Sequence, residues 1–211
     1  MQVDKILVKT ILTTLAAIFV LIAVTFGLLI LAFPSTMVDI TYELGMDDAS
    51  VWFADRAYDR SGEVYYAAFA AEASIGEDKP SNKQIEKYTA QLVKAKKFEA
   101  YCAERDARAI EGVSGGYAQY IYGQLYTAKY RRSKTAEAID GAFAVNSAAF
   151  PKNNAVVAVT FAAMQKKDVE TLLSIRARLG ALSTGGALTE TDAAYLKTLM
   201  AGIDERVGEL S

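Results

Sequence analysis

The feature that most constrains this chain is a long apolar run near its N-terminus. No charged residue occurs from Thr10 to Val38, and from Ile11 to Phe33 almost every residue is Leu, Ile, Val, Ala, Phe or Thr. At about 1.5 Å per residue, such a helix covers the ~30 Å hydrocarbon core of a bilayer. The sequence therefore predicts one transmembrane helix over residues 10–33.

A cleaved signal peptide is the alternative for a run in this position. Its apolar region is about 7–15 residues long and ends in small residues. Here the run is longer, and Phe33 followed by Pro34 makes a poor cleavage site. We therefore expect the segment to be kept as a membrane anchor.

The charges on the two sides of the run predict its orientation. Lys5 and Lys9 precede it, whereas the first basic residue after it is Arg56, behind several acidic residues. Because basic residues favour the cytoplasmic side, residues 1–9 are expected to form a cytoplasmic tail. The rest of the chain is then expected outside the plasma membrane.

The composition excludes several classes of site. Histidine is absent, which removes the commonest general base and the usual zinc ligand. The lone Cys102 cannot form an intramolecular disulfide and is read as a small buried helix residue. We expect no catalytic, metal or cofactor site, and the scattered carboxylates are read as solvated helix surface.

Beyond the anchor, abundant Ala and few alternating β-branched residues predict an all-α protein. Residues 34–46 are expected to form a connector, and residues 47–211 a helical-repeat domain. Helical apolar spacing and start signals predict nine helices, the last of them a cap, at about 48–60, 63–76, 82–95, 97–110, 117–131, 134–147, 153–165, 168–180 and 189–207.

Matches at a spacing near 71 residues suggest an internal duplication. They follow one another in the same order, which predicts a repeated unit at 58–128 and 130–200, each unit holding two helical hairpins of about 35 residues. The clearest matches pair Tyr58-Asp59-Arg60-Ser61 with Tyr130-Arg131-Arg132-Ser133, Pro80-Ser81-Asn82 with Pro151-Lys152-Asn153, Thr89 with Thr160, and Lys96-Lys97-Phe98-Glu99 with Lys167-Asp168-Val169-Glu170.

The half-period resembles the tetratricopeptide-repeat family, whose repeat is about 34 residues. Tyr130, Phe143 and Pro151 stand at the family's spacing for two helix aromatics and a closing proline, whereas Thr127 replaces its glycine. The resemblance covers residues 47–182 and implies an α-solenoid of stacked hairpins with a concave groove. In this register the groove would be lined by Gln84, Lys87, Gln91, Lys94, Gln124, Arg131 and Arg132.

One segment matches a serine-hydrolase pattern. Residues 112–116 read G-x-S-x-G, with Ser114 at the nucleophile position. A nucleophile elbow needs a preceding strand and a basic partner, but a helix is expected before it and histidine is absent. Because Thr184-Gly185-Gly186 repeats Ser114-Gly115-Gly116, the glycines are read as left-handed caps that end a helix.

Tyrosine and charge are unevenly distributed. The predicted helix 117–131 holds five tyrosines, which are either core residues or an aromatic binding surface that includes Tyr120 and Tyr126. Residues 39–78 carry ten acidic and two basic side chains, whereas residues 79–134 carry five acidic and twelve basic. This is either a solvated charge pattern or a basic groove.

Together these features predict a membrane-anchored, extracytoplasmic helical-repeat module that binds or scaffolds proteins or peptides. A partner with an acidic segment or a C-terminal carboxylate would suit the basic groove, and nucleic acid is not expected as a partner because the domain is slightly acidic overall. The alternative is a structural accessory subunit of a membrane or envelope complex, with Gly27, Thr13, Thr14 and Thr25 helping the anchor to pack against other spans.

Overall fold

The computed structural model describes residues 2–108, 116–133, 136–146, 150, 154–184 and 188–211. These residues contain helices and no strand, apart from one isolated β-bridge between Glu63 and Lys96. The helices are α1 (Gln2–Ala32), α2 (Pro34–Glu43), α3 (Asp47–Ser61), α4 (Val64–Gly76), α5 (Asn82–Lys94), α6 (Phe98–Arg108), α7 (Tyr117–Ser133), α8 (Ala136–Ala144), α9 (Ala155–Lys166), α10 (Val169–Thr184) and α11 (Glu190–Leu210). The all-α prediction is confirmed for the described residues.

Helix α1 has the properties expected of a membrane-crossing segment. Its stretch Leu7–Leu28 is long and apolar enough to cross a bilayer, and none of this stretch is buried against the rest of the protein. The helix begins before residue 10, where the prediction placed its start, because Lys5 and Lys9 continue the same helix.

The structure differs from the prediction just after α1. Residues 34–46 were expected to connect, but most of them form α2, which has Pro34 in its first turn. Proline suits this position because the N–H that it lacks has no partner there in any helix. Helix α2 packs on α3, and the Ser50 hydroxyl donates a 3.0 Å hydrogen bond to Thr41 Oγ1 between them.

The compact units also divide at a different residue from the one predicted. Residues 1–61 form one unit, so α3 belongs with α1 and α2 rather than with the helical domain expected from residue 47. Residues 62–211 form the second unit, α4–α11. The apolar face of α3, with Phe53 and Ala57 buried, is already covered by α2.

The second unit has packed side chains on both sides of α7. On one side, α4 contributes only small buried residues, four alanines and Ser74, which allow α5 to approach its backbone closely. On the other, α7–α11 share a continuous apolar cluster that includes Tyr130, Leu172 and Leu196. Each predicted helix from 63 onward corresponds to one of α4–α11, with ends that shift by a few residues.

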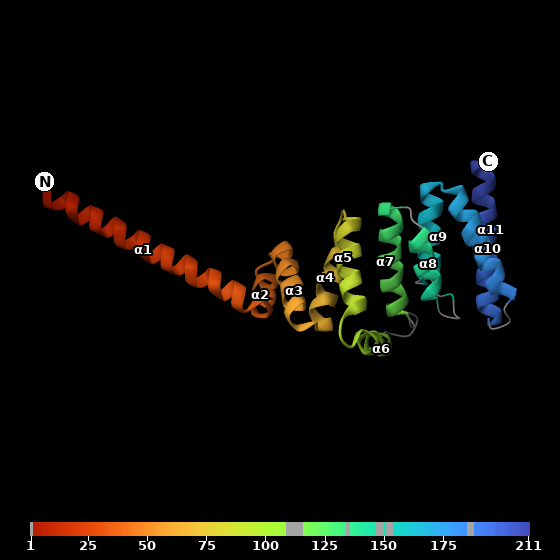
Figure 1. The fold of residues 1–211 in the computed structure, drawn as a ribbon, viewed down its shortest axis with the longest axis horizontal. Coiled ribbons are helices and arrows are strands. Elements are labelled where there is room, and N and C mark those ends of the chain that lie inside the picture. Colours follow the sequence, from red (N-terminus) through yellow and green to blue (C-terminus); the bar gives the residue numbers. More distant parts are fainter. Residues whose placement is uncertain (1, 109–115, 134–135, 147–149, 151–153, 185–187) are drawn as a thin grey trace. The chain divides into compact units, whose positions relative to one another are not determined.

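Helices α5, α7 and α9 are successive neighbours in this unit (Figure 1). Arg132, in the last turn of α7, reaches Glu86 in the first half of α5. At the other end Phe98, just past α5, contacts Tyr122 near the start of α7. Helix α5 therefore runs antiparallel to α7.

Helix α9, by contrast, runs parallel to α7. Ala155 at the start of α9 donates its N–H to Gln119 near the start of α7, and Arg131 near the end of α7 binds Gln165 near the end of α9. In the predicted repeat, α5, α7 and α9 are each the first helix of a hairpin, so all three should be parallel. Helix α9 is parallel to α7 as this register requires, whereas α5 is antiparallel to it.

The reason lies in α6. It is short and buries only Phe98 and Cys102, so it has too little apolar surface to pack along α5. Figure 1 shows it lying across the end of the α5–α7 pair instead. The chain thus passes from α5 to α7 without forming a hairpin with α6.

Candidate functional site

The predicted groove residues of α5 do not form one surface with those of α7. Lys87 and Lys94 are exposed, while Gln84 and Gln91 are half-buried. The ammonium of Lys87 lies 4.9 Å from the ring centroid of Tyr88. Because α5 is antiparallel to α7, Lys87 lies near the end of α7, and Lys94 lies toward its start.

The two arginines that end α7 point to opposite neighbours. The Arg132 guanidinium lies 2.7 Å from the Glu86 carboxylate of α5, whose side chain is only 17% exposed. Arg131 donates a 2.8 Å hydrogen bond to Gln165 Oε1 of α9. Arg132 is therefore engaged between helices, whereas Arg131 lies on an exposed face formed by α7 and α9.

That exposed face contains an aromatic residue that the sequence analysis missed. Phe161 is 52% exposed and lies one helical turn before Gln165 on α9. On α7, Gln124 is seven residues before Arg131 and shares its side of the helix. We call Gln124, Arg131, Phe161 and Gln165 the α7/α9 face. Phe161 was overlooked because helix periodicity alone assigns an aromatic residue to the core.

The tyrosines of α7 are mainly packing residues. Tyr126 stacks on Tyr122 with ring centroids 6.5 Å apart, and its ring covers Gly141 of α8. Tyr130 is fully buried and donates a 2.8 Å hydrogen bond to Asp168. Tyr120 is half-buried, and burial followed by the nearby Glu72 charge raises the pKa of its hydroxyl. These contacts favour the core reading over an aromatic binding surface.

A polar junction joins α4, α6 and α7, and no sequence pattern indicated it. Glu72 of α4 accepts hydrogen bonds from the Tyr117 and Tyr101 hydroxyls, and Arg105 of α6 lies 3.1 Å from the same carboxylate oxygen. The Arg105 guanidinium also lies 4.7 Å from the ring centroid of Tyr117. Burial raises the pKa of Tyr117, and the hydrogen bond to Glu72 raises it further.

The segment with the hydrolase-like pattern is only partly described. Gly112, Ser114 and Gly115 lie outside the described residues, but Gly116 has a φ of 135°. Gly116 directly precedes α7, so its positive φ belongs to a helix start rather than to the helix end that was predicted. The Asp106 carboxylate accepts the N–H groups of Gly116 and Tyr117 at 3.2 and 2.9 Å and caps that start.

A polar depression lies between α8 and α10, and the residues that line it include Asp140, Lys167 and Arg178. Arg178 is 2.7 Å from Asp140 and stacks over Phe143 at 4.0 Å. Basic and acidic side chains alternate around it. Its cations therefore have local carboxylates, which makes it a weaker anion site than the α7/α9 face.

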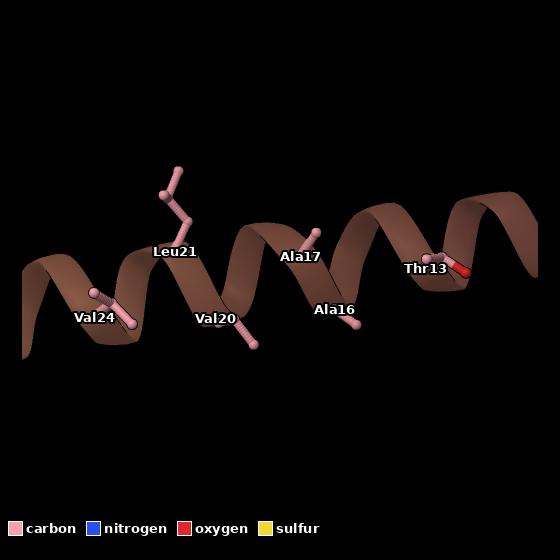
Figure 2. Close-up of a pocket in the computed structure, with 6 residues that line it drawn as sticks. All are labelled: Thr13, Ala16, Ala17, Val20, Leu21 and Val24. Atoms are coloured by element: carbon pink, nitrogen blue, oxygen red, sulfur yellow. The ribbon is translucent and has the colours of Figure 1, made fainter.

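Helix α1 carries a shallow apolar hollow, shown in Figure 2. The short side chains Thr13, Ala16 and Ala17 line its first part, and longer side chains such as Leu21 line the part that follows. The Thr13 hydroxyl donates to the Lys9 carbonyl at 2.7 Å, and Thr14 does the same to Thr10 at 2.9 Å. Both hydroxyls are satisfied within the helix, so the hollow is suited to close packing rather than to polar contacts.

The described part of the chain contains no cluster of metal-ligating side chains and no accessible thiol. Its Asp, Glu and Cys side chains form no group of three able to hold a metal ion. Cys102 is buried, and burial raises the pKa of its thiol to about 12. Comparisons with protein-family models, with curated proteins and with solved structures yield no match.

Proposed function

We propose that the chain is a membrane-anchored helical module that presents the α7/α9 face to a protein or peptide partner. The observation that carries this proposal is the pairing of an apolar helical stretch, Leu7–Leu28, none of which is buried, with a separately packed helical unit. A soluble protein would bury such a helix, whereas an anchor leaves it for lipid.

The charge distribution supports an extracytoplasmic position for this unit. Lys5 and Lys9 precede the apolar stretch, and acidic residues follow it up to Arg56. The positive-inside rule then assigns the N-terminus to the cytoplasm and the helical unit to the outside of the plasma membrane.

The arrangement of α7–α11 supports a relation to helical-repeat modules such as tetratricopeptide repeats. Helix α9 lies parallel to α7, and α8 contacts both of them while α10 contacts α9, which are the neighbours expected if α8 and α10 are the second helices of two hairpins. Such arrays bind extended segments along the exposed face of their first helices. We assign the α7/α9 face to that position, and the antiparallel α5 lies outside this pattern.

The chemistry of the face suits a segment with a carboxylate. Arg131 supplies a fork of N–H donors, Gln124 and Gln165 supply amides, and Phe161 supplies an apolar surface. An acidic side chain or a C-terminal carboxylate next to an apolar residue would engage all of these groups.

Site-specific crosslinking tests this proposal in intact membranes. A photo-reactive phenylalanine analogue at Phe161 should give an adduct of defined mass, whereas the same analogue at Leu173, exposed on α10, should give none. Equal adducts from both positions, or none from either, would contradict the assignment of the face.

Charge reversal provides the second test. Arg131→Glu should leave helicity and melting nearly unchanged, because this side chain is exposed, but should abolish the Phe161 adduct. Lys197→Glu changes the charge equally at an exposed position elsewhere and should retain the adduct. If the Arg131 variant retains the adduct, this arginine is only solvated helix surface.

The hollow on α1 favours a second candidate, a structural subunit of a larger membrane complex. Small residues at Thr13, Ala16 and Ala17 allow another helix to approach closely. Ala16→Leu with Ala17→Leu would then release the chain from a complex of fixed stoichiometry in mild detergent. Unchanged complex size in this variant would leave the anchor as a tether alone.

A further inference from the structure

The first unit exposes an unusual concentration of large apolar side chains next to α1. Among the described residues of the second unit, the only exposed large apolar side chains are Tyr65, Phe161 and Leu173. The much shorter stretch that holds α2 and α3 exposes twice as many, namely Phe33, Ile40, Tyr42, Leu44, Met46 and Trp52. Exposed apolar surface of this density marks an interaction surface.

Three of these residues form one stripe along α2. Phe33, Ile40 and Leu44 are separated by seven and four residues, so they share a side of the helix. The neighbouring side, with Val38 and Thr41, is buried against α3. At about 100° per residue, Asp39 and Glu43 fall on a different side, away from both.

A second stripe runs along α3. Trp52, Arg56 and Arg60 follow one another at four-residue intervals. The Arg56 guanidinium lies 3.9 Å above the Trp52 ring, and Arg60 Nη1 donates a 2.7 Å hydrogen bond to the carbonyl of Ala32. This carbonyl belongs to the last turn of α1 and has no partner within its own helix, so Arg60 ties this stripe to the end of the apolar helix.

Both stripes lie on the same side of the hairpin. Helices α2 and α3 are antiparallel, because Thr41 meets Ser50 at the turn and Arg60 returns to the end of α1. With their buried sides facing each other, the helical rotation of about 100° per residue places both stripes on one broad face. The acidic residues of α2 and Asp59 of α3 fall on the outer edges.

We propose that this broad face lies on the lipid headgroup layer of the leaflet in which α1 ends, a proposal that rests on α1 spanning the membrane. Phe33 alone separates α1 from α2. This linker is too short for the α2–α3 hairpin to move away from the membrane surface. Tryptophan favours the boundary between headgroups and acyl chains, and arginine donates to lipid phosphates there. The hairpin thereby acts as an interfacial element, with apolar side chains in the lipid and acidic edges in water.

The chain contains one tryptophan, Trp52, which reports directly on this contact. The full chain is reconstituted into phosphatidylcholine vesicles, and Trp52 fluorescence is quenched by acrylamide from water or by lipids brominated near the headgroup end of the acyl chain. We expect the Trp52 emission maximum to lie at a shorter wavelength than that of the protein unfolded in urea. We also expect strong quenching by the brominated lipid and weak quenching by acrylamide. Water-like emission with full acrylamide access and no lipid quenching would overturn the proposal.

Two variants and one separate measurement make the result specific. Ile40→Asp with Leu44→Asp should reduce quenching by the lipid, whereas Leu173→Asp, an equally exposed position of the second unit, should not. Lipid quenching that persists undiminished in the α2 variant would contradict the docking of the broad face. Flotation of the vesicles after alkaline extraction tests the anchor alone: protein that floats but keeps Trp52 in water refutes only the docking, and protein that does not float refutes the anchor.

Discussion

At the scale of single residues, one carboxylate organises the contact of three helices. Glu72 accepts from Tyr101 and Tyr117 and pairs with Arg105, while the rings of Tyr101 and Tyr117 meet edge to face at 5.8 Å. Helix α6 has few other apolar contacts, so these polar and aromatic contacts hold it against the unit. Nothing in the sequence linked Glu72 to residues 29 and 45 positions away, because such pairing depends on the tertiary fold.

Replacing Tyr117 by Phe tests this junction. The change removes one hydrogen bond to a charged group and leaves the ring, so we expect a loss of about 1–2 kcal/mol in the free energy of unfolding. Urea denaturation of the full chain in detergent measures it. Tyr65→Phe, which alters an exposed tyrosine, is the matched control and should change little. Equal stability of both variants would show that the Glu72 bond contributes nothing net.

Gly116 gives a second test at this scale. A β-branched side chain is disfavoured at its φ of 135°, so Gly116→Val should destabilise the unit by roughly 1 kcal/mol or more. Ser114→Ala, two positions earlier, should leave the fold and any measured activity unchanged. Thermal melting followed by circular dichroism compares the two variants. A hydrolase activity lost in the Ser114 variant would revive the nucleophile reading.

At the scale of elements, periodicity identified almost every helix but not how the helices run. The buried positions Ile85, Thr89 and Leu92 of α5 recur at helical spacing, so the element and its core side were predictable. The same pattern is compatible with a parallel or an antiparallel neighbour, so the direction of α5 was not. Helix α2 was missed because the uncharged run continues into it, so that no change in composition marks Pro34 as the first-turn residue of a new helix.

The contact between α7 and α8 allows a matched test with two glycines. A Cβ at Gly141 would lie 2.2 Å from Tyr126 Cε1, whereas one at Gly180 in α10 would meet nothing nearer than Arg176 Nη1 at 3.9 Å. Gly141→Ala should therefore destabilise by about 1–3 kcal/mol despite its better helix propensity. Gly180→Ala should be neutral or stabilising by up to ~1 kcal/mol. Urea denaturation measures both variants.

A double variant separates crowding from other effects of the Gly141 change. Adding Tyr126→Ala should remove most of the extra cost of Gly141→Ala, because the two positions interact directly. If the losses in the free energy of unfolding from Gly141→Ala and Tyr126→Ala are simply additive in the double variant, Tyr126 is not the residue that the new methyl group displaces.

At the scale of the whole molecule, the exposed apolar helix α1 and the charges on its two sides are the features that predict the membrane topology. The surface was less predictable than the fold: of the two arginines predicted to line a groove, Arg131 is exposed and Arg132 is engaged by Glu86, and the exposed Phe161 was not anticipated. Surface partners such as these depend on which helices adjoin, and no pattern within a single helix records that.

Surface labelling of introduced cysteines tests the topology. The native Cys102 is buried and its thiol pKa is raised, so it should stay silent toward a maleimide. Lys83→Cys and Ala201→Cys, both exposed, should react with a membrane-impermeant reagent in intact cells, whereas Gln2→Cys should react only after permeabilisation. The reverse pattern would invert the orientation.

The single residue between α1 and α2 has a consequence for how a partner is found. A long flexible linker would let the helical unit search a wide volume, and its local concentration near any membrane-bound target would fall with linker length. If α1 spans the membrane as proposed, Phe33 as the whole linker keeps the first unit in a thin layer over the bilayer. A partner of this unit would then be met by lateral diffusion in two dimensions, and a partner that shares the membrane would gain a large advantage over a soluble competitor with the same intrinsic affinity.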